Sequence, residues 1–252
     1  MLFNYHTHTT RCNHATGNER EYVENAIKSG LKTLGFADHA PYLFPNGYQS
    51  GFRMKTEQLF EYAEVIRSLA KEYEKDIRIL CGFELEYYPD FHAEQMAFLR
   101  QVQPDYLLMG QHFIGAEIGT PHISSQASHD LLLTAYVSQV IAGLSTGDFL
   151  YLAHPDLPGM VFTPEVCRAE YTRLCEFAKR KNIPLEINLL GLATNRKYPS
   201  RGFFEIAANV GNDIVLGIDA HNPEAILDKA TQQKALDMAK DLGLHLITQP
   251  LL

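Results

Sequence analysis

The sequence predicts an α/β fold with a parallel sheet at its centre. Short apolar runs alternate seven times with longer segments of helical periodicity, which is typical of β/α units joined in series. The chain has 252 residues, of which 46% are hydrophobic, so it can bury one large core. We therefore expect a single domain over residues 1–252. With seven units the sheet can close into a barrel, and a doubly wound open sheet is the alternative.

The predicted strands are short runs rich in apolar residues. They lie at 3–5, 34–37, 77–81, 105–109, 149–153, 184–188 and 214–218. The predicted helices carry an apolar stripe or a recognisable start or stop. They lie at 19–29, 56–73, 91–101, 131–144, 163–181, 201–210 and 222–243.

Particular residues justify these bounds in chain order. Gly30 ends the first helix, and Leu59, Ala63 and Ile66 begin the buried stripe of the second. Pro164 stands at the first position of a later helix, where its fixed φ angle suits the helical turn. The stretch 41–51 is rich in proline, glycine and asparagine, and 115–128 is polar and contains glycine, so both are expected to be loops, the second over the site. Residues 244–247 are expected to form a short terminal strand.

The composition disfavours several classes of function. The formal net charge is -8 with eleven histidines counted as neutral, whereas nucleic acids and acidic membranes attract basic surfaces. We therefore expect neither a nucleic acid nor a membrane as partner. No apolar stretch approaches the roughly 18 residues of a membrane span, and the N-terminus lacks the pattern of a signal peptide. The four scattered cysteines are interpreted as reduced thiols of a cytoplasmic protein.

Nine side chains of the types that bind metals occur at, or just beyond, the ends of predicted strands. They are His6, His8, His14, His39, Glu84, His112, His154, Asp219 and His221. Residues two apart in a strand point to the same face, so His6 and His8 can reach one ion together. The carboxyl ends of barrel strands share one face, where active sites are built. We therefore expect the nine side chains to converge on a metal centre.

Imidazole and carboxylate ligands suit Zn²⁺, Mn²⁺ or Fe²⁺. Nine ligands exceed the needs of one ion, so two or three divalent metal ions are expected. Such a cage is positively charged and favours an anion, for which a phosphate ester fits. A metal-bound hydroxide would hydrolyse the ester without a protein nucleophile. The sequence contains neither a Gly-rich phosphate loop nor a Gly-X-Ser-X-Gly elbow.

The order of these motifs resembles that of the polymerase-and-histidinol-phosphatase (PHP) family. The motifs are His6-Thr7-His8, His14, Asp38-His39, Gly82-Phe83-Glu84, Gly110-Gln111-His112-Phe113, Ala153-His154-Pro155-Asp156-Leu157 and Asp219-Ala220-His221. Within the family, the stretches 12–15, 82–87, 154–158 and 198–200 are similar to the monofunctional histidinol-phosphate phosphatases. The resemblance spans essentially the whole chain. It implies a distorted (β/α)7 barrel of the PHP type and a trinuclear metal centre.

The resemblance also implies how the ligands are shared among the ions. The first ion would take His6, His8, Glu84 and Asp219; the second Glu84, His112 and His154; the third His14, His39 and His221. By the same likeness, the catalytic residues would be His6, His8, Glu84, Asp219 and His221. The chain departs from the family at Glu86, Ile218 and Ala193, where aspartate, serine and arginine are frequent. These departures leave the particular substrate open.

Substrate contacts are expected from loops that face the same end as the cage. Arg53, Arg196 and Arg201 lie in such loops, and the arginine fork matches phosphate oxygens. Glu86 is expected to bind a substrate amine or to support a ligand. For each of the four, an ordinary solvated side chain is the alternative.

We expect metal-dependent hydrolysis of a small phosphate monoester, with L-histidinol phosphate as the leading substrate. One alternative is another reaction on the same fold, such as hydrolysis of a phosphotyrosine, a phosphodiester or a C–N bond. The other is a non-catalytic domain that metal stabilises.

Overall fold

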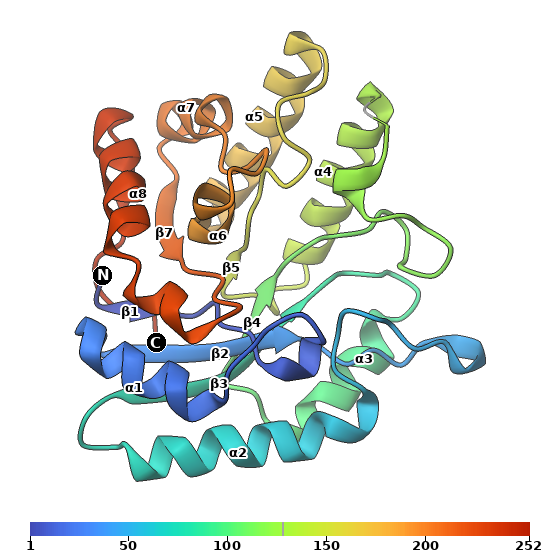
Figure 1. Cartoon of the computed structure of the whole chain (residues 1–252). Helices are drawn as coiled ribbons and strands as arrows, with labels where there is room; N and C mark the ends of the chain where they lie inside the picture. The colour runs from blue at the N-terminus through green and yellow to red at the C-terminus, as the bar shows by residue number, and fades with distance from the viewer. Residues whose placement is uncertain (128) are drawn as a thin grey trace.

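The computed structural model describes residues 1–127 and 129–252, and a parallel sheet of eight strands forms its centre (Figure 1). Neighbours in the sheet are also neighbours in the chain, so β/α crossovers connect them. The strands are β1 (Phe3–Asn4), β2 (Thr33–His39), β3 (Arg78–Leu85), β4 (Tyr106–Met109), β5 (Tyr151–Leu152), β6 (Leu185–Asn188), β7 (Asp213–Gly217) and β8 (His245–Leu246). The predicted α/β fold is confirmed, including the short terminal strand. Ser128, the last residue of the predicted loop 115–128, lies outside the described residues.

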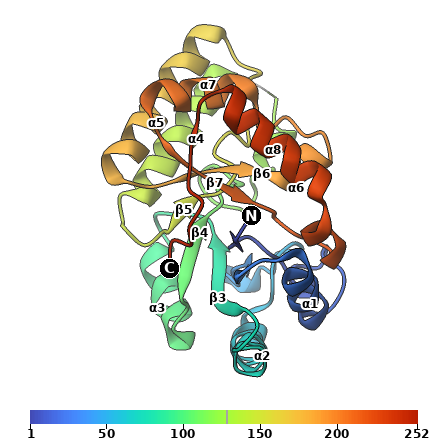
Figure 2. The ribbon, with the colours of Figure 1, turned by 90° about the vertical axis from the view of Figure 1, so that its left-hand side faces the viewer.

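Helices cover the outside of the curled sheet (Figures 1 and 2). They are α1 (Glu19–Ser29), α2 (Leu59–Glu72), α3 (His92–Leu99), α4 (Asp130–Leu144), α5 (Pro164–Lys181), α6 (Leu189–Ala193), α7 (Arg201–Val210) and α8 (Lys229–Asp241). Two of them differ most from expectation. The short helix α6 lies in a predicted loop, and α8 begins late because residues 223–227 form a separate 3₁₀ turn capped by Asn222. None of the helices in the described residues is both long and apolar enough to cross a membrane.

The sheet closes on itself at its carboxyl end. Thr7, beyond β1, forms a parallel bridge with Ala220, beyond β7. The backbone N–H of His8 donates to the carbonyl of Ala220 at 2.9 Å, and the N–H of Ala220 donates to the carbonyl of His6 at 3.2 Å. The first seven strands therefore form the distorted (β/α)7 barrel that the resemblance implied. The short β8 pairs with the start of β7.

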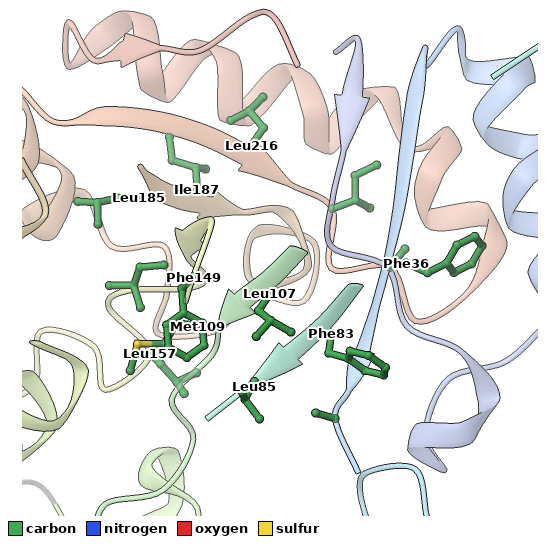
Figure 3. Close-up of a cluster of buried hydrophobic side chains, with 14 of the residues drawn as sticks. Phe36, Phe83, Leu85, Leu107, Met109, Phe149, Leu157, Leu185, Ile187 and Leu216 are labelled. Carbon is green, nitrogen blue, oxygen red and sulfur yellow. The ribbon is translucent and has the colours of Figure 1, made fainter. Parts of the chain in front are cut away.

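Side chains along the strands alternate between two apolar layers. Leu107 and Met109 of β4 belong to the large cluster shared with the helices (Figure 3), whereas Tyr106 and Leu108 belong to a smaller cluster of residues in or next to strands. The same period of two places Glu186 of β6 on the inner face. Apolar side chains thus fill one part of the barrel interior, and polar side chains occupy its carboxyl end.

Candidate metal centre

A cavity of about 750 Å³ opens at the carboxyl end of the barrel. Seven of the nine predicted ligands line it: His14, His39, Glu84, His112, His154, Asp219 and His221. The remaining two, His6 and His8, are fully buried and contact Glu84 and Asp219. Phe52, Leu157 and Leu190 add apolar wall, and Arg196 and Lys197 add positive charge.

Glu84 is the central member of the ligand cluster. Its Oε2 lies 3.4 Å from Nε2 of His6 and 3.0 Å from Nδ1 of His39. Its Oε1 lies 2.7 Å from Nε2 of His154 and 3.5 Å from Nε2 of His112. One carboxylate therefore meets imidazoles from four other segments of the chain, as a bridging ligand would.

Gly110 makes room for the Glu84 carboxylate. A Cβ atom at position 110 would lie 1.8 Å from Oε1 of Glu84, which no side chain permits. The glycine follows β4 and the carboxylate stands near the end of the neighbouring β3. The Gly-Gln-His sequence at 110–112 thus supplies both a ligand and the space for its neighbour.

Asp219 gathers the ligands on the other side. Its Oδ1 lies 3.1 Å from Nε2 of His8, 3.5 Å from Nε2 of His6 and 3.4 Å from Nδ1 of His221. The Nε2 atoms of His221 and His14 are 2.9 Å apart. His14, His39 and His221, the set expected for a third ion, offer three ligand atoms within 4.8 Å of one another. The structure thus brings all nine predicted ligands to one site.

The donor set fits divalent cations. Among the described residues, the buried atoms Nε2 of His6, Nε2 of His8, Nδ1 of His39 and Oδ1 of Asp219 have no hydrogen-bond partner. Buried polar atoms are normally paired, and these four lie within one group of contacting ligands. Imidazole nitrogens and carboxylate oxygens are the donors that zinc, manganese and iron accept. The residues of the cluster can therefore hold divalent metal.

Both carboxylates of the cluster and the imidazole of His221 are in the protonation state that binds metal. Burial raises the pKa of Glu84, but the neighbouring imidazoles, His39 foremost, bring it well below its usual range. The pKa of Asp219 is likewise well below its usual range, since His6 and other imidazoles outweigh the effect of burial. Burial, with the charge on His8, lowers the pKa of His221 to about 3. Ionised carboxylates and a neutral imidazole are the forms that bind metal ions.

Several imidazoles are fixed by the nitrogen that does not face the cluster. The Nδ1–H groups donate from His6 to Glu186 (2.8 Å), from His14 to the Cys12 carbonyl (2.8 Å), from His112 to Glu86 (2.8 Å) and from His221 to the Asp219 carbonyl (3.0 Å). Partners of this kind hold the ring orientation and the tautomer of a ligand. Asp38 lies 3.4 Å from Nδ1 of His8. Asp156, two residues after His154, accepts the backbone N–H of Ser200.

Glu186 is a site residue that the sequence analysis missed. It is fully buried, and besides His6 it accepts the backbone N–H of His154 and the side-chain amide of Asn188, each at 2.9 Å. Gly217 makes room for it, since a Cβ there would lie 1.7 Å from Oε1 of Glu186. The available signal was a carboxylate in the middle of a strand expected to be buried on both faces.

Of the four predicted substrate contacts, only Arg196 is among the described residues that line the cavity. Arg53 and Glu86 are buried outside it and pair with each other at 3.0 Å. Arg201 is exposed on α7 and pairs with Glu205 at 3.1 Å. The expectation that Arg53, Arg201 and Glu86 meet the substrate therefore disagrees with their positions, because their polar groups face other side chains.

The loop that begins at Gly115 does reach the site, and it brings His122 and Ser124 to the cavity. The backbone N–H of Ser124 donates to Nδ1 of His122 at 3.2 Å, so Nε2 carries the proton of the neutral ring. Burial, followed by the charge of neighbouring imidazoles, lowers the pKa of His122 to about 3. His122 thus offers an uncharged N–H donor to the cavity.

Known proteins are similar to this chain in sequence. The profile of the PHP domain matches residues 4–189. A probable histidinol-phosphatase of Deinococcus radiodurans is 30% identical over 228 residues, which cover 88% of this chain and 87% of that protein.

Solved structures are similar in fold. Histidinol phosphate phosphatase of Lactococcus lactis, complexed with zinc, L-histidinol and phosphate, aligns with a TM-score of 0.75 at 22% identity over 98% of this chain and 95% of that chain. One of the metal-dependent tyrosine phosphatases YwqE of Bacillus subtilis and CpsB of Streptococcus pneumoniae aligns with a TM-score of 0.55 at 16% identity over 96% of this chain and 88% of that chain. The profile match and the relative from Deinococcus radiodurans together show that the chain belongs to the PHP domain family.

Proposed function

We propose that the chain is a metal-dependent phosphomonoesterase that hydrolyses L-histidinol phosphate to L-histidinol and phosphate. The observation that carries the proposal is the cluster of nine ligand-type side chains at the bottom of a cavity that also presents Arg196 and Lys197. The choice of substrate is supported by the name of the relative from Deinococcus radiodurans and by the L-histidinol and phosphate held by the Lactococcus lactis structure.

We infer that the cluster holds two or three ions of zinc, manganese or iron. The first would be held by His6, His8, Glu84 and Asp219, the second by Glu84, His112 and His154, and the third by His14, His39 and His221. When bound, such ions supply Lewis-acid polarisation of the phosphate and activation of water near neutral pH.

The residues of the cavity wall bind and orient the ester. Arg196 and Lys197 supply positive charge for the phosphate oxygens, and the Nε2–H of His122 supplies a neutral donor. The apolar wall of Phe52, Leu157 and Leu190 packs against the organic part of the substrate and keeps water from that side. The cavity wall therefore combines polar groups that bind the phosphate with an apolar surface that suits a flat ring.

The test is phosphate release from L-histidinol phosphate by purified protein loaded with Mn²⁺ or Zn²⁺. His8→Ala and Asp219→Ala should each abolish it, because each removes a ligand. Turnover that survives either substitution would overturn the assignment. A panel with phosphotyrosine and a phosphodiester separates the proposed reaction from others on the same fold.

We further propose that the partner is a small phosphorylated molecule rather than a nucleic acid or a membrane, which the net charge of -8 supports. We also propose a reducing, cytoplasmic location, which is supported by the four cysteines, since all of them are free and buried.

A further inference from the structure

Arg53 is a fully buried cation whose donors are all engaged by the protein. Its side chain is 2% exposed. The guanidinium donates to both oxygens of Glu86 at 3.0 and 3.1 Å, twice to Oε2 of Glu117 at 3.0 and 2.7 Å, and to the carbonyl of Ala40 at 3.1 Å. An arginine has five N–H donors, so none is left for a substrate. Arg53 must therefore act through the groups that it holds.

The two carboxylates, Glu86 and Glu117, come from different loops around the cavity. Glu86 follows β3 and accepts the Nδ1–H of His112 at 2.8 Å. Glu117 lies in the loop after β4, which brings His122 to the cavity. Arg53 itself comes from the loop after β2, next to Phe52, another lining residue. One guanidinium thus joins three loops around the cavity.

The charges explain why a single arginine can hold this arrangement. Glu86 and Glu117 are 0% and 5% exposed, so each needs a partner that replaces water. The planar fork of Arg53 meets both at once, which the compact ammonium of a lysine cannot do. Removal of either carboxylate leaves a neutral ion pair, whereas removal of the arginine leaves two buried anions.

We propose that Arg53 is a positioning residue that holds two parts of the site in place. Through Glu86 it fixes the ring of His112, and through Glu117 it holds the loop that carries His122 over the cavity. The proposal deepens the proposed function. It rests on one part of that function, the binding of metal by the cluster.

The matched variants Glu86→Gln and Glu117→Gln separate the two effects, since each makes the same change beside the same arginine. Metal affinity is measured by equilibrium dialysis with Zn²⁺ and elemental analysis, and loop protection by hydrogen exchange of residues 115–127, both without substrate. In Glu86→Gln we expect the weakest-bound ion to lose about tenfold or more in affinity, because the partner of a ligand is altered. In Glu117→Gln we expect wild-type metal affinity and faster exchange in the loop.

Arg53→Lys should show both changes, and it keeps the positive charge so that the protein folds. The proposal is overturned if Arg53→Lys retains wild-type metal affinity and loop protection, or if the two glutamine variants give one and the same pattern. Because neither measurement uses a substrate, wild-type protein that binds metal but fails to hydrolyse L-histidinol phosphate would count against the proposed function alone. Exposed Arg20, which pairs with Glu72 on the outer surface, provides the control variant Arg20→Lys, expected to change neither readout.

Discussion

Replacing Glu186 by glutamine should weaken metal binding, although Glu186 is not itself a predicted ligand. Its Oε1 accepts the Nδ1–H of His6 at 2.8 Å and the hydroxyl of Tyr151 at 3.3 Å. Its Oε2 accepts the backbone N–H of His154 and the amide of Asn188, each at 2.9 Å. Glutamine has one acceptor oxygen, so its NH₂ group must face one of these two pairs of donors.

The magnitude follows from which donors lose their acceptor. If the NH₂ group faces His6, the imidazole loses the partner that orients it, and substitutions of such partners cost about 10- to 100-fold in metal affinity, or about 1.4 to 2.7 kcal/mol. If it faces His154 and Asn188, two buried donors are unsatisfied, at about 1 to 3 kcal/mol each in stability. Glu186→Gln therefore lowers metal affinity, unfolding free energy, or both.

The assay is a titration of metal-free protein with Zn²⁺, together with urea unfolding of the metal-free form. Tyr151→Phe is the matched control, because it removes only the longest of the four contacts to the same carboxylate and keeps the ring. A Glu186→Gln protein with the metal affinity and the unfolding free energy of the Tyr151→Phe control would refute the reasoning.

Substitutions at three further positions test other parts of the site. Gly110→Ala places a Cβ 1.8 Å from the present position of Oε1 of Glu84, so metal content and phosphate release should both fall, by about tenfold or more; wild-type metal content would contradict this. His122→Phe removes a donor from the cavity wall, so KM should rise several-fold at unchanged metal content, and His122→Gln should restore part of the loss; equal KM values in all three proteins would exclude the contact. Burial raises the pKa of Asp156 to about 6, above its value of about 3.9 in the unfolded chain. The folded protein thus holds this proton longer and loses stability as pH rises between these values, so Asp156→Asn should gain unfolding free energy relative to wild type from pH 4 to pH 7 in urea titrations.

The convergence of the nine predicted ligands could be predicted from the sequence because of one topological rule. In a parallel barrel the carboxyl ends of all strands meet, so side chains as far apart in the chain as His6 and Asp219 were expected to converge, and the structure brings them within 3.5 Å. The rule needs only approximate strand ends. His39 and Glu84 lie inside longer strands than predicted, yet near enough to the ends to reach the same site.

Residues that act through other residues could not be predicted in this way. Arg53 looked like a phosphate ligand because its loop faces the site, but its partner Glu117 lies 64 residues further along the chain. No local pattern reports a pair so distant, and the pairing decides where the guanidinium points. Glu186 was missed for the opposite reason, since it lies within a strand and not at its end.

The buried carboxylates of the site bear on how many ions it needs. Besides Glu84 and Asp219, the structure adds Asp38 and Glu186, both 0% exposed and each beside a predicted ligand. Glu86 is equally buried beside His112, and together with Glu117 and Arg53 it contributes one further negative charge. Two divalent ions would leave one of these five negative charges unbalanced, whereas a third would leave a net positive charge, which attracts a phosphate monoester dianion. Binding of inorganic phosphate should therefore be weak at two equivalents of Zn²⁺ per chain and increase steeply at the third, as calorimetry can measure. Full phosphate affinity at two equivalents would mean that the positive charge for the anion comes from Arg196 and Lys197 instead, and the double variant Arg196→Met with Lys197→Met would then abolish phosphate binding.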